Sequence, residues 1–357
     1  IFNGSYYENL AVDKSVTLSG QDKYNTGIVN TIDVEAILVS ADNVTISGLE
    51  INNSGSNSVG IEFFQCSGGL VNDTIVTDCT GHPGIIVKES NHTKVMNSLV
   101  TFSGAGVSIS SSEYTTVIGN YLISNDNYGI YQSGYQGGFT YSYISENQIN
   151  SNAFEGLYMS GGNHNAICYN NFSNNMQGIY LHDGCNYTQI HHNTIEQNDY
   201  GILLHAAHNN SVFENSIHNN TIFGLRSLIY ASNPSLNNLI YHNTFINNSQ
   251  NAFDECENTW DNGYPSGGNY WDDYYGIDEN GDGIGDTPYD ISGGANQDNY
   301  PLGIFNLAPI ANFTYDPLVP DVGETISFAD TSFDSDGNIT SWSWTFGDGD
   351  TSSEQNP

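Results

Sequence analysis

Hydrophobic and polar residues follow a pattern that repeats along this chain, and we call one copy of the pattern the phrase. A glycine followed by an aliphatic residue is succeeded by about a dozen polar residues, and then by an asparagine with another aliphatic residue. Successive phrases between about residues 48 and 248 are 22 to 27 residues apart. A repeat of this length predicts a solenoid. The glycines of the phrase are Gly60, Gly84, Gly106, Gly129, Gly156, Gly178, Gly201 and Gly224.

A second ladder of polar residues runs between these glycines, usually in the form N-x-(I/L/F). The repeat is rich in Asn, Gly, Ser, Thr, Ile and Tyr, which favour strands and turns. Short alternating runs, such as residues 43–47 and 188–192, predict a parallel β-helix with three short strands in each coil. We expect equivalent residues to stack about 4.8 Å apart, with asparagine in the left-handed conformation at a corner. The ladder consists of Asp73, Asn97, Asn120, Asn147, Asn170, Asn193, Asn215 and Asn243.

Two longer repeats interrupt the period, at residues 131–143 and 230–238. We expect these insertions to project as loops from one side of the solenoid. The period ends after residue 248, and residues 260–275 contain a dense group of aromatic side chains. Such a group can stack on sugar rings, but we interpret it first as a cap over the open hydrophobic end of the β-helix.

An acidic stretch after the aromatic group matches the first nine positions of a calcium-binding loop. Gly283 stands at the sixth position, where the chain must turn sharply. The twelfth position is Tyr289 rather than Glu, so the last ligand of the motif is altered. The sequence predicts calcium as a cofactor, with oxygen ligands from Asp278, Asn280, Asp282, the carbonyl of Ile284, and Asp286.

The last fifty residues change to strand-like alternation typical of a β-sandwich. They are too few for a complete immunoglobulin-like sandwich of about 100 residues. We therefore predict an all-β chain of three parts: a parallel β-helix over residues 1–255, an aromatic and calcium-binding cap over 256–303, and a sandwich fragment over 304–357.

Charge limits the partners of this chain. It has 40 acidic and five basic residues, for a net charge of −35. Nucleic acid binding needs Lys and Arg to neutralise phosphates, and an anionic membrane surface would repel the chain. We expect no membrane insertion, because no apolar run approaches the 18 residues of a membrane span. Abundant N-x-S/T sequons fit an exported glycoprotein, and a start at Ile1 fits a signal peptide that was removed or lies outside this sequence.

The five cysteines leave their pairing open. Cys66 and Cys79, and likewise Cys168 and Cys185, are close enough in sequence to form a disulfide bond within or between neighbouring coils. Cys256 is then left over. None of the five belongs to a C-x-x-C motif, so zinc and thioredoxin-like chemistry have no support.

Two sets of motifs resemble known families. The Gly-Ile and Asn-x-Ile ladders, with Gly268-Asn-Tyr-Trp-Asp-Asp-Tyr and the loop at 278–286, resemble the NosD-type right-handed β-helix repeats of archaeal, especially methanogen, surface proteins. This resemblance covers about residues 1–303. The tail resembles a polycystic-kidney-disease (PKD) domain, through Phe328-Ala-Asp-Thr-Ser, Phe333-Asp-Ser-Asp-Gly and Trp344-Thr-Phe-Gly-Asp-Gly. Together the resemblances imply an extracellular or cell-envelope location.

Candidate chemistry is sparse. His182 and His205 each lie four residues after the glycine of their repeat, so they should stack on adjacent coils. Paired imidazoles can bind copper or zinc, but solvated turn histidines are the simpler interpretation. After Lys94 the chain has only one further Lys or Arg, Arg226, and the acidic pair Asp272-Asp273 has no basic neighbour in sequence. Lyases of β-helical fold need such a basic group, so we predict a protein that is not an enzyme.

The sequence therefore predicts a non-catalytic structural or adhesive protein of the cell surface: a surface-layer, sheath or filament subunit, or a stalk module. Its partners would be copies of itself or other envelope proteins, joined through open strand edges. One alternative is a protein that binds glycans or modifies polyuronides with an outer face of the solenoid. A second alternative is a copper-handling protein, which the NosD resemblance implies.

Overall fold

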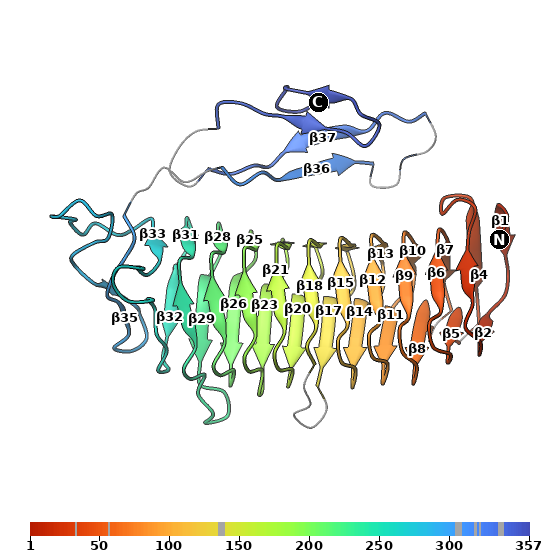
Figure 1. The fold of residues 1–357 in the computed structure, drawn as a ribbon, viewed down its shortest axis with the longest axis horizontal. Coiled ribbons are helices and arrows are strands. Elements are labelled where there is room, and N and C mark those ends of the chain that lie inside the picture. Colours follow the sequence, from red (N-terminus) through yellow and green to blue (C-terminus); the bar gives the residue numbers. More distant parts are fainter. Residues whose placement is uncertain are drawn as a thin grey trace.

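The structure is a computed structural model that describes residues 1–32, 34–55, 58–134, 140–303, 309–317, 320, 323–334 and 339–357. In this part of the chain, three long parallel sheets contain 12, 11 and 10 strands. The chain visits the three sheets in turn, so each strand pairs mainly with strands one coil earlier and one coil later (Figure 1). The predicted parallel β-helix with three short strands per coil is confirmed.

The strands of the solenoid are short. Sheet 1 consists of β1 (Gly4–Tyr6), β4 (Thr26–Asn30), β7 (Glu50–Asn53), β10 (Ile75–Thr77), β13 (Leu99–Thr101), β16 (Tyr121–Ile123), β19 (Gln148–Asn150), β22 (Asn171–Ser173), β25 (Thr194–Glu196), β28 (Ser216–His218), β31 (Thr244–Ile246) and β33 (Tyr270–Trp271). Sheet 2 consists of β2 (Leu10–Val12), β5 (Ile37–Val39), β8 (Ile61–Phe64), β11 (Pro83–Lys88), β14 (Ala105–Ser110), β17 (Tyr128–Ser133), β20 (Glu155–Ser160), β23 (Gln177–His182), β26 (Tyr200–His205), β29 (Phe223–Leu228) and β32 (Ala252–Asp254). Sheet 3 consists of β3 (Thr17–Ser19), β6 (Thr45–Ser47), β9 (Leu70–Asn72), β12 (Lys94–Met96), β15 (Thr116–Ile118), β18 (Tyr143–Ser145), β21 (Ala166–Cys168), β24 (Gln189–His191), β27 (Ser211–Phe213) and β30 (Leu239–Tyr241).

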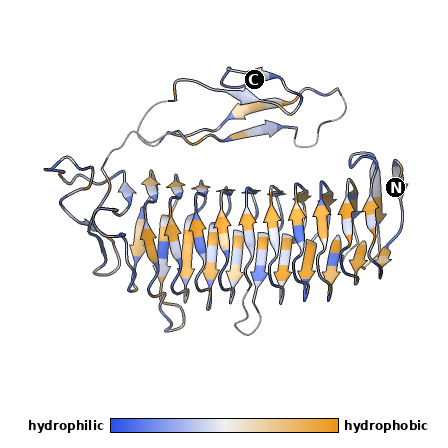
Figure 2. Cartoon of the chain, viewed as in Figure 1, coloured by the Kyte–Doolittle hydropathy of each residue, from blue (hydrophilic) through white to orange (hydrophobic). Residues whose placement is uncertain are grey.

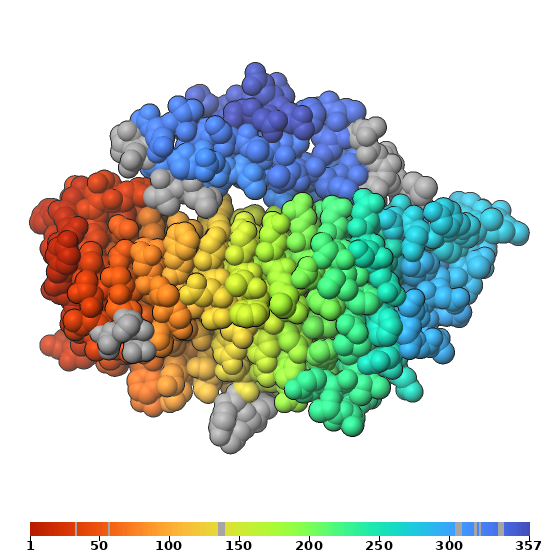
Figure 3. Space-filling model, turned by 180° about the vertical axis from the view of Figure 1, so that it is seen from behind, coloured from red at the N-terminus to blue at the C-terminus, as the bar shows by residue number. Residues whose placement is uncertain are grey.

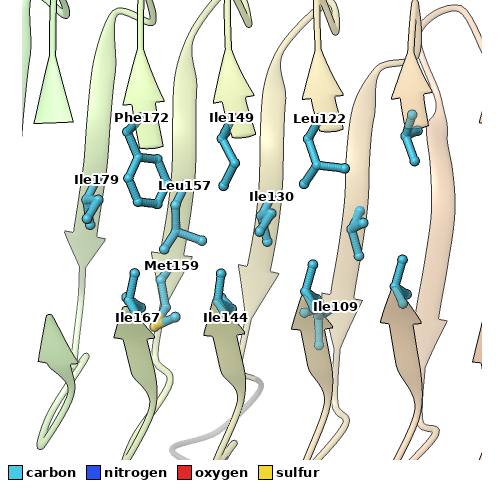
Figure 4. Packing of buried hydrophobic residues seen from close by; sticks show 14 of the residues in the cluster. Ile109, Leu122, Ile130, Ile144, Ile149, Leu157, Met159, Ile167, Phe172 and Ile179 are labelled. Carbon is cyan, nitrogen blue, oxygen red and sulfur yellow. The ribbon is translucent and has the colours of Figure 1, made fainter. Parts of the chain in front are cut away.

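The aliphatic residue of the repeated phrase forms one column of the core. Ile130, Leu157 and Ile179 pair in register on consecutive strands of sheet 2, and none of the three is exposed. They meet Ile149 of sheet 1 and Ile167 of sheet 3 inside the coil (Figure 4). Apolar segments recur from coil to coil along the whole solenoid (Figure 2). Stacking of neighbours therefore buries a continuous core that no single coil has.

The glycine of the phrase is required by close backbone approach. A Cβ at Gly129 would lie 2.6 Å from the carbonyl oxygen of Gly156 and 2.4 Å from a methyl group of Ile149. Since real Cβ atoms do not approach so closely, a side chain here would push adjacent coils apart.

The asparagine ladder differs from its prediction in two respects. Its left-handed residue is the one before each asparagine, for example Tyr169 (φ 57°) before Asn170 and His192 (φ 54°) before Asn193. Asp73 and Asn97 are themselves left-handed, at φ 51° and 47°, so they belong to that preceding column. The expectation of left-handed ladder asparagines is therefore wrong, and so is the placement of these two residues in the ladder.

The ladder itself is a chain of buried hydrogen bonds. The Oδ1 of Asn193 accepts from the backbone N–H of Asn170 and from its Nδ2, each at 3.0 Å. The same pattern links consecutive coils from Asn120 to Asn269. Sequence analysis missed a second, parallel ladder at the next corner, formed by Asn125, Asn152, Asn175, Asn198, Asn220 and Asn248.

Aromatic residues lie over the C-terminal end of the core. Trp260 is fully buried and Trp271 is 2% exposed. Their indole N–H groups donate to the carboxylates of Asp254 and Asp298, both at 2.9 Å. A small antiparallel pair, β34 (Tyr289–Asp290) and β35 (Gln297–Asp298), completes this region. Sheet 1 continues beyond residue 255 through β33, and the domain boundaries at 255 and 303 stay predictions.

The C-terminal arm contains two antiparallel pairs: β36 (Phe313–Asp316) with β37 (Ser327–Asp330), and β38 (Trp344–Thr345) with β39 (Thr351–Ser352). The arm lies along the outer face of sheet 1 (Figures 1 and 3). There the ring of Phe333 stacks on His218, with centroids 4.3 Å apart. Residues 335–337 of the motif that begins at Phe333 lie outside the described residues.

The second insertion projects from one edge of the solenoid after β29, as predicted (Figure 1). The central part of the first insertion, residues 135–139, lies outside the described residues. Within the described chain, no helix has the length and apolar character needed to cross a membrane.

All five cysteines are buried and free, so neither of the pairings considered from the sequence is formed. Burial raises the pKa of Cys79 to about 12 and that of Cys185 to about 11. Both thiols therefore remain protonated at neutral pH, where the thiolate is the reactive form.

Candidate functional site

Three tyrosines occupy equivalent outward positions on sheet 2. Tyr131, Tyr158 and Tyr180 pair in register on β17, β20 and β23. Each directly follows the buried aliphatic residue of the repeated phrase, and successive side chains of a strand point to opposite faces. The phrase that builds the core therefore also places a row of tyrosines on the outside.

The rings of this row contact one another. Tyr131 and Tyr158 are stacked almost parallel, with centroids 5.4 Å apart and planes inclined by 3°. Tyr180 lies edge-on to Tyr158, with centroids 5.3 Å apart. All three side chains are half-buried. Their mutual contacts hold the rings in place while part of each remains open to solvent.

His182 and His205 extend this surface by two further positions, in register on β23 and β26 as predicted. The hydroxyl of Tyr158 lies 3.3 Å from Nδ1 of His182, and that of Tyr180 lies 2.7 Å from Nδ1 of His205. The imidazole centroids are 6.4 Å apart. Each histidine thus has one ring nitrogen held by a tyrosine from the coil before it.

Burial decides the protonation of these pairs. Burial, together with the charges of His182 and Arg226, lowers the pKa of His205 to about 4. Burial raises the pKa of Tyr158 to about 12 and also raises that of Tyr180. At neutral pH the phenols are therefore protonated and His205 is neutral, so the Tyr180 hydroxyl donates to Nδ1 of His205.

The second insertion adds one more ring to this surface. Tyr230 stacks on His205 with centroids 5.6 Å apart, and its ring lies 4.7 Å from that of His182. We refer to Tyr131, Tyr158, Tyr180, His182, His205 and Tyr230 as the tyrosine–histidine face. The described residues of the arm contact sheet 1, at Tyr121, Glu196 and His218.

Charged groups beside the face include Asp183, which follows His182, and Glu255, whose charge acts on His205. The Arg226 guanidinium is packed against three rings, those of Tyr200, Phe223 and Phe253, at 4.9 to 5.9 Å from their centroids. Burial raises the pKa of Glu155 to about 7. The register neighbour of Glu155 on β23 is Gln177, an uncharged amide.

The predicted calcium ligands lie together in one loop of the cap: Asp278, Asn280, Asp282, Ile284 and Asp286. Both carboxylate oxygens of Asp278 accept backbone N–H groups of the loop, from Gly281 at 2.7 Å and from Gly283 at 2.8 Å. Gly283 has φ 87°, which fits the sharp turn at the sixth position.

The oxygen donors of this loop suit calcium. Within the described residues, however, no three side chains of His, Cys, Asp or Glu are close enough together to hold a metal ion. Calcium binding at this loop stays a prediction.

The acidic pair of the cap serves a structural purpose. The Nδ2 of Asn251 donates to Oδ1 of Asp272 at 2.8 Å and to Oδ1 of Asp273 at 2.9 Å. The hydroxyl of Tyr289 also donates to Asp273, at 3.0 Å. These bonds join the last coil to the cap.

Comparison with known proteins identifies the family. A family model described as periplasmic copper-binding protein (NosD) matches residues 3–195 and 175–276. The chain belongs to the NosD family. A PKD domain model matches residues 306–357 of this NosD-family protein, which confirms the resemblance of the tail. A search of curated proteins finds no match to the chain.

Solved structures share the fold of this NosD-family protein at low sequence identity. The Dettilon tailspike protein is 15% identical with a TM-score of 0.58, and the match covers 92% of this chain and 70% of that one. DFA-IIIase from Arthrobacter chlorophenolicus A6 is 11% identical with a TM-score of 0.53, covering 72% and 75%. The A-module of the Azotobacter vinelandii mannuronan C-5 epimerase AlgE6 is 13% identical with a TM-score of 0.48, covering 72% and 87%. At such identities the first two show the fold alone.

Sequence analysis of this NosD-family protein considered His182 and His205 but missed the tyrosines beside them. A signal was present: the phrase continues as Gly-Ile-Tyr or Gly-Leu-Tyr at residues 129–131, 156–158 and 178–180. A tyrosine at one fixed position of successive repeats predicts a row of rings on one face. The contact of Tyr230 had no such signal, since it depends on the path of the inserted loop.

Proposed function

We propose that this NosD-family protein is a non-catalytic adhesive protein of the cell envelope, and that it binds neutral glycans on the tyrosine–histidine face. The observation that carries the proposal is the in-register row of half-buried tyrosine rings, with their hydroxyl groups and with the imidazoles of the neighbouring histidines. Sugar rings contact the solvent-exposed parts of aromatic side chains through their C–H groups, and their hydroxyls bond to polar groups at the ring edges. Rings fixed by mutual contacts lose little entropy on binding.

The charge of the chain favours a neutral glycan. With 40 acidic and five basic residues, the protein repels a polyanion such as a polyuronide. Arg226, the basic residue beside the face, is packed among three aromatic rings. A carboxylated sugar would therefore gain little from it.

The titratable groups support a binding role rather than catalysis. A general base works best with a pKa near the operating pH; the pKa of His205, about 4, lies far from that range, whereas burial raises that of Glu155 to about 7. Most glycoside hydrolases use a pair of carboxyl groups, whereas the register neighbour of Glu155 is Gln177. The role we propose for the face is therefore to hold a glycan unchanged.

The family description supports a location outside the cytoplasm, since it names a periplasmic protein. Within that location we propose display at the cell surface, where the stack of coils would act as a stiff rod that carries the face. Association with copies of itself or with other envelope proteins stays a prediction.

The test is binding of neutral oligosaccharides, screened on a glycan array and measured by calorimetry. We expect Tyr158→Ala to weaken binding at least tenfold, because Tyr158 contacts both other tyrosines of the row. Tyr114→Ala is the matched control, since Tyr114 is an exposed ring in a different stack, between His92 and Tyr141. Circular dichroism would establish that both variants are folded. Equal loss in both variants, or no binding of any neutral glycan, would refute the proposal.

Metal handling is a second candidate function. The family description names copper binding, and the described chain brings histidines together at two places: His182 with His205, and His191 with His192.

A further inference from the structure

The tyrosine row on sheet 2 has a definite end. The register neighbour of Tyr180 on β26 is Leu203, which is apolar and only 6% exposed. The row is therefore closed at this coil, and a glycan that runs along it toward the C-terminal end of the solenoid must turn aside. The side chains beside that end are the imidazoles of His182 and His205, two positions farther along the same two strands.

Tyr230 lies over these imidazoles. It belongs to the insertion that follows β29, yet its ring contacts β26 and β23, one and two coils earlier. The ring is stacked on His205 with planes inclined by 15°, and it is edge-on to His182 with planes inclined by 69°. A six-membered ring from the chain itself is thus placed where the tyrosine row ends.

The turn that carries Tyr230 is weakly stabilised. Residues 230–233 form a two-residue hairpin turn, in which the backbone groups of Tyr230 and Asn233 bond to each other at 2.9 and 2.7 Å. Ala231 and Ser232 at its centre have φ of 48° and 69°, a conformation that Asn and Gly adopt more readily. Tyr230 is 44% exposed, and its hydroxyl has no hydrogen-bond partner within the described residues. The ring contacts with the two histidines are therefore the main interactions that hold it in place.

His205 has an unused donor at this position. Its Nδ1 accepts a hydrogen bond from the hydroxyl of Tyr180 at 2.7 Å, so the proton of the neutral imidazole is on Nε2. Nε2 is buried and has no hydrogen-bond partner within the described part of the chain. A buried donor without an acceptor destabilises the structure that contains it. A ligand that brings an acceptor oxygen to Nε2 would remove this cost.

We propose that the place of Tyr230 on His182 and His205 is a sugar subsite, the last of the tyrosine–histidine face, and that Tyr230 fills it only while no glycan is bound. This inference rests on the proposed function. A neutral sugar residue contacts the imidazole of His205 through its C–H groups, and one of its hydroxyl oxygens accepts a hydrogen bond from Nε2–H. The base of the hairpin stays fixed, because the N–H of Ile229 donates to Oε1 of Glu255 at 2.8 Å.

Displacement of Tyr230 weakens the binding of long glycans. Such a glycan binds only the fraction of molecules in which Tyr230 has moved away, and the apparent dissociation constant is the intrinsic one divided by that fraction. Removal of the ring opens the subsite in every molecule. The affinity for a chain that reaches His205 should therefore increase, whereas removal of an ordinary binding ring would decrease it.

The experiment measures chain-length dependence by calorimetry on the intact protein. The probes are neutral homo-oligosaccharides of glucose, mannose and galactose, two to six units long. We expect Tyr230→Ala to bind the longest chains at least fivefold more tightly than the wild type, with a gain that increases with chain length. Ile229→Ala is the matched control, because Ile229 is an exposed side chain of the same insertion that lies outside the face; it should bind like the wild type.

The donor is tested in a second background. His205→Phe keeps a ring at this position but removes Nε2–H, so its addition to Tyr230→Ala should abolish most of the gain. In the wild type, nuclear magnetic resonance should show that the longest chain shifts the ring signals of Tyr230, as expected when the ring leaves His205. This measurement needs no variant.

Two outcomes separate the subsite from the proposed function. If the wild type binds an oligosaccharide but Tyr230→Ala binds the long chains equally or more weakly, or if the ring signals of Tyr230 stay unchanged, the subsite is wrong while glycan binding stands. If the wild type binds none of the oligosaccharides, the subsite and the proposed function both fail.

Discussion

Replacing one ladder asparagine by alanine should destabilise the solenoid far beyond the effect of an ordinary substitution. The side chain of Asn170 makes five buried hydrogen bonds. Its Nδ2 donates to Asn193 Oδ1 at 3.0 Å, to Ile144 O at 3.0 Å and to Cys168 O at 3.1 Å. Its Oδ1 accepts from the backbone N–H of Asn147 at 3.0 Å and from Nδ2 of that residue at 2.9 Å.

The cost follows from these partners. Each lost hydrogen bond contributes about 1 kcal/mol, and a buried N–H left without an acceptor costs about 1 to 3 kcal/mol. Asn170→Ala leaves the backbone N–H of Asn147 in this position, and Asn147 is fully buried. We expect a loss of about 3 to 5 kcal/mol in the free energy of unfolding. With a slope of about 3 kcal/mol per molar urea, the midpoint falls by 1 M or more.

The assay is urea unfolding followed by circular dichroism, with hydrogen exchange measured at the amide of Asn147. Asn174→Gly is the control, because Asn174 is an exposed, left-handed asparagine of the same coil, and glycine accepts its φ of 55° without strain. A midpoint for Asn170→Ala within 0.2 M of the control, or unchanged protection at Asn147, would show that the ladder is not the source of stability argued here.

Three further predictions concern pH and calcium. Burial lowers the pKa of His218, beneath Phe333, to about 4 from 6.5, so docking of the arm should be strongest above about pH 6.5 and should weaken as the pH falls to 4; small-angle scattering would follow the arm. Burial raises the pKa of Asp298 to about 6 from 3.8, so its contribution to stability should fall by about 3 kcal/mol between pH 4 and 6, and Asp298→Asn should flatten the dependence of the melting temperature on pH. Millimolar calcium should raise the melting temperature by a few degrees in the wild type and not in Asp278→Ala.

For each of these three predictions, one comparison between the wild type and a variant could contradict it. The arm prediction fails when His218→Phe shows the same response to acid as the wild type. For Asp298, equal pH profiles in the wild type and the variant would contradict the assigned role. A calcium effect that is absent, or that is the same in Asp278→Ala, would remove the loop as its site.

Much of the fold could be predicted because a solenoid repeats its nearest-neighbour contacts. The aliphatic column through Ile130, Leu157 and Ile179 is visible as a period in the sequence, since each residue meets its equivalent one coil away. At the asparagine corner, the left-handed conformation was predicted for the asparagine, whereas the residue before it adopts that conformation. The N-x-Ile pattern does not reveal which of two adjacent residues takes positive φ, and only the backbone path shows that it is His192 rather than Asn193.

The candidate sites depended more on tertiary structure. The sequence by itself determined the period, the net negative charge and the separate positions of the histidines, and it contained an unread signal for the tyrosine row. Only the folded chain brought Tyr230 of an insertion onto His205, laid Phe333 on His218 and turned His191 toward His192. The physical reason is whether a contact recurs from coil to coil. Stacking between equivalent residues recurs in every repeat, so it produces a period in the sequence. Contacts made by an inserted loop, by a terminal arm or by one left-handed turn occur only once and produce no period.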